Sequence, residues 1–121
     1  MDKDAAEWVK MAEDNLATAK ILSQNDKFKD AAYYSQQVAE KALKAVQIVK
    51  LKRFDKLHDL QELAESVKAP GEVSTCAKSL TRYYISARYP LVEEHAVSEE
   101  DVGKAIADAE KVLEWAKQIL K

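Results

Sequence analysis

The stretch YYSQQVAEKALKAVQ, residues 33–47, lies in the middle of the longest helix that the sequence predicts. It belongs to a pattern in which apolar and small residues recur at three- and four-residue steps, typical of an amphipathic helix. We predict this helix to run from about Phe28 to Lys52, and small side chains in its middle allow a neighbouring helix to approach closely. The stripe consists of Phe28, Ala31, Ala32, Ser35, Val38, Ala39, Ala42, Val46 and Val49.

A second flank of the same helix carries Tyr34, Lys41, Ile48 and Leu51. A helix with apolar side chains on more than one side often has two partners, and one of them can be another subunit. The flank therefore predicts a homodimer.

Outward from this helix, the same periodicity predicts three more long helices and a short one. Asp4 with Glu7 resembles a capping pair at the first, and Ser98, followed by acidic residues, is a strong N-cap for the last. Pro90 ends the helix before it, because proline disfavours a helical residue ahead of it. The helices are expected over residues 4–23, 59–67, 72–89 and from 99 to the C-terminus. We predict an all-α fold, an antiparallel up-down four-helix bundle with one short accessory helix, as a single domain over residues 1–121.

The composition supports a few long helices joined by short loops. The 121 residues include only two glycines and two prolines, whereas a sheet-rich domain needs many tight turns. The net charge of −2 gives no global attraction for nucleic acid, so a site for a polyanion must be local. The sequence shows no signal peptide and no apolar run that could span a membrane, so we expect a cytoplasmic protein.

One segment, RYPLVEEH at residues 88–95, carries a candidate for chemistry. The Arg88 guanidinium matches phosphate oxygens, and His95 titrates near neutrality. A metal-free ribonuclease requires a base for the ribose 2′-hydroxyl and a cation beside the phosphoryl oxygens. No cysteine or histidine pairing has zinc spacing, and we expect neither metal nor cofactor.

Structural explanations compete with that hypothesis. An arginine in the last turn of a helix interacts favourably with the helix dipole, which accounts for Arg88 without catalysis. Cys76 lies on or beside an apolar stripe and is expected to be a core thiol. His58 opens the short helix and is expected to be structural. The four residues Gln36, Gln37, Glu40 and Lys41 are expected on a solvated face, with cleft-lining as the alternative.

The combination of motifs resembles the HEPN family over nearly the whole chain. The resemblance rests on the tryptophan of the opening helix, the YYSQQVAEKALKAVQ helix, the His58-Asp59-Leu60 segment and the helix that ends in Arg-Tyr-Pro at residues 88–90. It implies a dimeric helical bundle and, in many members, a metal-independent endoribonuclease acting through an Arg-x4-6-His motif. Here Arg88 and His95 match that motif at its longest spacing.

The resemblance also implies partners. Many small members are similar to toxins of a toxin-antitoxin pair, neutralised by a minimal nucleotidyltransferase encoded beside them. In one ribonuclease branch a small polar residue follows the arginine and a tyrosine two positions beyond the histidine is adenylylated. This chain has Tyr89 and Val97 at those places, so regulation by adenylylation is not expected.

Two further roles remain open. The first is a non-catalytic module that binds a nucleotide or a nucleotidyltransferase partner, and the second is a bundle that serves only assembly. If RNA or a nucleotide is bound, a secondary set of residues is expected to contact it, besides Arg88 and His95. This set comprises Gln37, Lys41, Lys44, Arg82 and Tyr89.

Overall fold

The computed structural model describes residues 2–88 and 96–121, and the side chains of these residues apart from 85–88. Over these ranges the chain forms five helices and no strand. They are α1 (Lys3–Gln24), α2 (Phe28–Leu51), α3 (Leu60–Ser66), α4 (Gly71–Arg88) and α5 (Glu99–Ile119).

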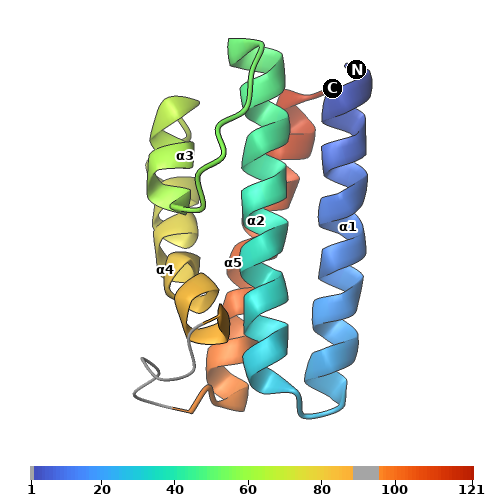
Figure 1. Cartoon of the computed structure of the whole chain (residues 1–121), viewed down its shortest axis with the longest axis vertical. Coiled ribbons are helices and arrows are strands. Elements are labelled where there is room, and N and C mark those ends of the chain that lie inside the picture. Colours follow the sequence, from blue (N-terminus) through green and yellow to red (C-terminus); the bar gives the residue numbers. More distant parts are fainter. Residues whose placement is uncertain (1, 89–95) are drawn as a thin grey trace.

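The long helices form an antiparallel bundle. Figure 1 shows α1, α2, α4 and α5 alternating in direction along the chain, with the short α3 packed beside α4. The start of α1 and the end of α5 lie at the same end of the bundle. The predicted all-α bundle with one accessory helix is therefore confirmed.

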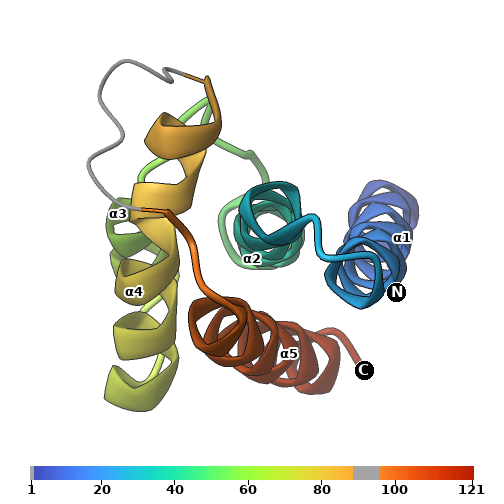
Figure 2. The same cartoon turned by 90° about the horizontal axis from the view of Figure 1, so that it is seen from below.

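Helix α2 is the centre of the molecule. It contacts each of the other four helices, and Figure 2 shows it between α1 and α4, with α5 beside it. Fourteen of its 24 residues are buried, which is more than one apolar stripe can supply, so α2 must also bury polar side chains. Small residues such as Ala31, Ala39 and Ala42 are fully buried and let the neighbouring helices approach.

This central position changes the interpretation of the second flank of α2. Ile48 is buried within the chain, and Lys41 donates a hydrogen bond to Asn15 of α1. Part of the surface predicted to contact another subunit is therefore covered by the chain itself. Leu51 remains exposed.

The helix ends follow local capping chemistry. Asp2, rather than the predicted Asp4, caps α1, because its carboxylate accepts from the free backbone N–H groups of Asp4 and Ala5 at 2.8 and 3.1 Å. Ser98 caps α5 as predicted. No helix among the described residues is long and apolar enough to cross a membrane.

Candidate functional site

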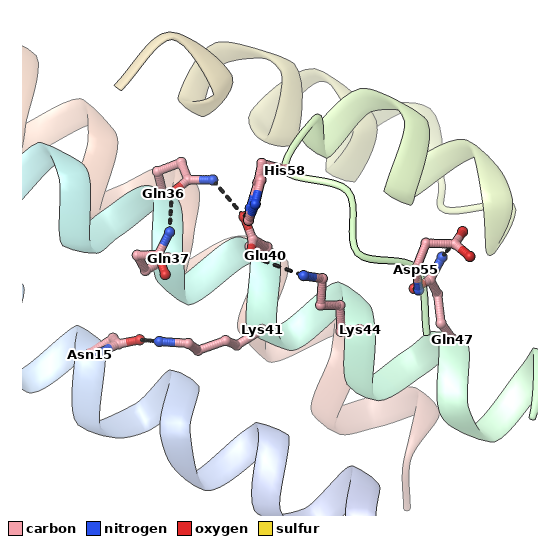
Figure 3. Close-up of polar contacts among 9 residues, drawn as sticks. All are labelled: Asn15, Gln36, Gln37, Glu40, Lys41, Lys44, Gln47, Asp55 and His58. Carbon is pink, nitrogen blue, oxygen red and sulfur yellow. Dashed lines mark hydrogen bonds and ion pairs between the residues drawn. The ribbon is translucent and has the colours of Figure 1, made fainter. Parts of the chain in front are cut away.

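A buried carboxylate, Glu40 in the middle of α2, organises the polar side chains of the bundle (Figure 3). Its Oε1 accepts a hydrogen bond from Gln36 at 3.1 Å, and its Oε2 lies 3.1 Å from the Lys44 ammonium. Both partners come from adjacent turns of α2, so the helix itself places them. A charge buried in the protein needs such pairing to offset its desolvation.

The third partner of Glu40 is His58, which precedes α3 on the loop that follows α2. Its Nδ1 lies 3.0 Å from Glu40 Oε1. Because an ionised carboxylate only accepts hydrogen bonds, Nδ1 is the donor in this contact, and Nε2 is the ring nitrogen on the opposite side from Glu40. The His58 side chain is 47% exposed while that of Glu40 is 6% exposed, so the pair joins the interior to the surface.

The His58 ring is also held by an aromatic neighbour. It stacks on Tyr84 of α4 with ring centroids 4.4 Å apart and planes 14° apart. Tyr33 of α2 lies next to the stack, with its ring centroid 6.5 Å from that of Tyr84. The carboxylate and the stack together fix both the position and the plane of the imidazole.

The amide of Gln36 extends the network along α2. Gln37 donates to Gln36 Oε1 at 2.6 Å, so the chain of hydrogen bonds runs from Gln37 through Gln36 to Glu40. Gln36 is fully buried and Glu40 is 4% exposed, so the expectation of a solvated face was wrong for these two residues. The loop and the other helices cover this side of α2, and mutual hydrogen bonding makes that burial tolerable.

A second polar contact ties the same loop to α2. The fully buried Gln47 donates to Asp55 Oδ2 at 3.0 Å and accepts from the Asp55 backbone N–H at 3.0 Å. Gln47 also donates to Ser66 Oγ at 2.8 Å. The segment between α2 and α3 is thus anchored independently of His58.

The predicted motif residues lie at the end of α4 and beyond it. Arg88 is the last residue of α4 and is described by its backbone, whereas Tyr89 and His95 lie outside the described residues. Tyr84 lies one helical turn before Arg88. Positions four apart share a helix face, so the stack on His58 and position 88 lie along the same side of α4.

Two of the predicted secondary residues on α2, Lys41 and Lys44, contact side chains of α1, whereas the third, Gln37, bonds Gln36 of α2 itself. The Lys44 ammonium is buried, paired with Glu40 and 5.8 Å from the centre of the Trp8 ring, so it is not presented to a phosphate backbone. Lys41 is half-buried beside Asn15, and burial lowers the pKa of its ammonium. Lys44 therefore neutralises Glu40, which is a different role from the predicted RNA contact.

Arg82 is separated from this cluster. It donates to the Tyr83 hydroxyl at 2.6 Å and lies 4.0 Å from an Asp101 oxygen. It lines a surface hollow of about 390 Å³ between α4 and α5, together with Lys78 and Lys104. Arg82 and the Glu40–His58 pair belong to different surfaces.

Cys76 is a buried thiol, as predicted. Burial and a hydrogen bond with Asp108 raise its pKa, which disfavours the nucleophilic thiolate. Among the described residues, no group of three His, Cys, Asp or Glu side chains is arranged to hold a metal ion.

The Glu40–His58 pair was not among the site residues predicted from sequence. A carboxylate that fixes one nitrogen of an imidazole, with the ring still reachable from solvent, can exchange a proton with a bound molecule. The His58-Asp59-Leu60 segment contains a sequence signal for this pair. Asp59 caps α3, and the residue before the cap, His58, contacts Glu40 of α2.

Comparison with known proteins identifies the family. The model of the HEPN domain matches residues 5–119. The chain belongs to the HEPN family. The matched range includes both Arg88 and His95 of the predicted motif. The resemblance to the HEPN family that was inferred from the sequence is confirmed.

Relatives of this HEPN chain cover almost its whole length. A protein of Methanocaldococcus jannaschii named "Putative toxin MJ1304" is 31% identical, and the match covers 98% of this chain and 90% of that protein. The crystal structure of TT1696 from Thermus thermophilus has a TM-score of 0.88 at 25% identity and covers 98% of this chain and 99% of that one. ST0689, described as an archaeal HEPN homologue, has a TM-score of 0.83 at 28% identity with full coverage of both chains.

Proposed function

We propose that this HEPN protein is a toxin-type endoribonuclease that cleaves RNA without a metal ion. In this proposal Arg88 stabilises the charge that develops on the phosphoryl oxygens, and His95 transfers a proton. The observation that carries it is the family match over residues 5–119, which includes both motif residues, together with a relative of similar length named "Putative toxin MJ1304". The place of Arg88 as the last residue of α4 is consistent with it, because the motif then lies at a helix end and in the segment that follows it in the sequence.

The proposal includes two partners. An isologous dimer repeats the same surface in both subunits, so it would bring two copies of the Arg88 and His95 pair around one cleft. A minimal nucleotidyltransferase would act as the antitoxin that restrains the activity.

The test is cleavage of total RNA in the presence of EDTA. The wild-type protein is compared with Arg88→Ala and His95→Ala. Loss of a proton-transfer group should lower the rate by about 10²–10⁴-fold, and loss of a charge-stabilising group by about 10²–10³-fold. Arg53→Ala is the matched control, because Arg53 is an exposed arginine on the loop after α2 and should leave cleavage unchanged.

Two results would contradict the proposal. One is a His95→Ala protein, purified in the same way, that cleaves RNA as fast as the wild type. The other is a folded wild-type protein that binds ATP in calorimetry and never cleaves RNA, which would identify a nucleotide-binding module instead.

A further inference from the structure

RNA cleavage by 2′-hydroxyl attack involves two proton transfers. The 2′-hydroxyl gives up its proton as O2′ bonds to phosphorus, and the bond from phosphorus to O5′ breaks as O5′ takes up a proton. The products are a 2′,3′-cyclic phosphate and a 5′-hydroxyl. The motif supplies one imidazole per chain, whereas the chemistry benefits from a base and an acid.

His58 has the geometry of a proton-transfer group. Its Nδ1 is fixed at 3.0 Å from the buried Glu40 carboxylate, and its ring is stacked on Tyr84. A base oriented by a third group through one nitrogen, with the other nitrogen left for the reaction, is the arrangement seen when histidine acts on a hydroxyl. The carboxylate is itself immobilised by Gln36 and Lys44.

His58 lies near the end of α4, where Arg88 of the motif is located. Tyr84 lies one turn before Arg88 on the same face of α4, and one turn is about 5.4 Å along a helix. The imidazole of His58 is stacked on that tyrosine, so it lies near the helix end at which the RNA phosphate is proposed to bind. His58 is 47% exposed, which leaves its ring accessible to a ligand.

A purely anchoring role does not account for this arrangement. The segment between α2 and α3 is already held by the two hydrogen bonds between Gln47 and Asp55. Its far end is held by Asp59, which caps α3 through its side chain. The contact from His58 to Glu40 is therefore additional to two independent anchors.

We propose that His58 is the second proton-transfer residue of the ribonuclease, with Glu40 as its positioning residue. This inference rests on the proposed function. One of the two imidazoles, His58 or His95, takes the proton of the 2′-hydroxyl, and the other gives a proton to the leaving O5′. Each chain then supplies both an acid and a base.

The first test is the pH dependence of cleavage by His58→Asn. Asparagine keeps an N–H donor for Glu40 but cannot exchange a proton, so the variant should melt near the wild-type temperature. We expect a rate about 10²–10⁴-fold lower and the loss of one limb of a bell-shaped pH profile. His95→Asn should lose the opposite limb.

Asp55→Ala is the matched control. It loosens the same loop by removing the carboxylate that accepts from Gln47, without touching the imidazole. It should keep both limbs of the pH profile. A purely structural role for His58 predicts instead that His58→Asn and Asp55→Ala behave alike.

The second test uses RNA with sulfur in place of the bridging 5′ oxygen at one site. A thiolate leaves without being protonated, so the variant that lacks the acid should recover most of its rate on this substrate. We expect recovery for one of His58→Asn and His95→Asn and not for the other. Recovery of neither, or of both, would overturn the assignment of complementary roles.

The outcomes separate the two proposals. A wild-type protein that does not cleave RNA contradicts the proposed function and the inference with it. A folded His58→Asn protein that cleaves at the wild-type rate with both pH limbs, while His95→Asn is inactive, overturns the inference alone.

Discussion

Glu40 is an acidic residue whose side chain is buried inside the bundle. Three side chains from α2 and the following loop, those of Gln36, Lys44 and His58, converge on its two oxygens. No described side-chain nitrogen or oxygen that is buried lacks a hydrogen-bond partner, so the network is complete within the described residues. A complete buried network is stabilising, but each member depends on the others.

That dependence predicts a large cost for Glu40→Ala. Its removal leaves the buried Lys44 ammonium unpaired, and breaking a buried ion pair from one side typically costs about 3–5 kcal/mol. The control is Glu13→Ala, which breaks the exposed pair with Lys117 at a similar distance, 2.9 Å against 3.1 Å. An exposed pair contributes at most about 1 kcal/mol. Urea unfolding measures both, and equal small losses would contradict a buried, coupled network.

The sequence could not reveal that network. Glutamate and lysine four residues apart, as at positions 40 and 44, occur both on solvated faces and in buried pairs. What distinguishes them here is the coverage of α2 by the loop that carries His58, which is a tertiary feature. Cys76 was predictable because an apolar stripe on its own helix already surrounds it.

At the scale of the elements, capping fixes the start of α5. Ser98 Oγ accepts from the Asp101 backbone N–H, and Asp101 Oδ2 accepts from the Ser98 N–H, both at 3.0 Å. This reciprocal pair satisfies two backbone donors that the helix itself cannot. It defines the residue at which α5 begins.

Ser98→Ala should therefore destabilise the protein by about 0.5–2 kcal/mol, since alanine cannot accept from the Asp101 N–H. Ser79→Ala is the matched control, because Ser79 lies inside α4 and its hydroxyl only donates to the Thr75 carbonyl. Alanine is a better helix former than serine, so the control should be neutral or slightly stabilising. Thermal unfolding of both variants measures the difference, and the same shift in both would contradict the capping role.

The elements themselves were largely predictable. Each helix lies within one or two residues of its expected range, because periodicity, Pro90 and Ser98 are local signals. The cap of α1 was misplaced because Asp2 and Asp4 are both suitable acceptors near the helix start. Asp2 is the cap because its carboxylate accepts hydrogen bonds from the backbone N–H groups of Asp4 and Ala5, which have no partner within the helix.

At the scale of the whole molecule, the central position of α2 explains why the polar side chains gather there. A helix that contacts four others must bury polar as well as apolar positions, and its polar residues then pair with one another, with the adjoining loop or with polar side chains of neighbouring helices. The site therefore follows from the topology as much as from any motif. The motif predicted Arg88 and His95 as candidate residues, and the fold brings Glu40 and His58 together as two further candidates.

The chemical ends of the RNA fragments that the purified protein produces in EDTA distinguish the two modes of cleavage. Attack by the 2′-hydroxyl under acid–base catalysis predicts a 2′,3′-cyclic phosphate on one fragment and a 5′-hydroxyl on the other. Fragments that carry a 3′-hydroxyl and a 5′-phosphate, the products of attack by water, would contradict the account.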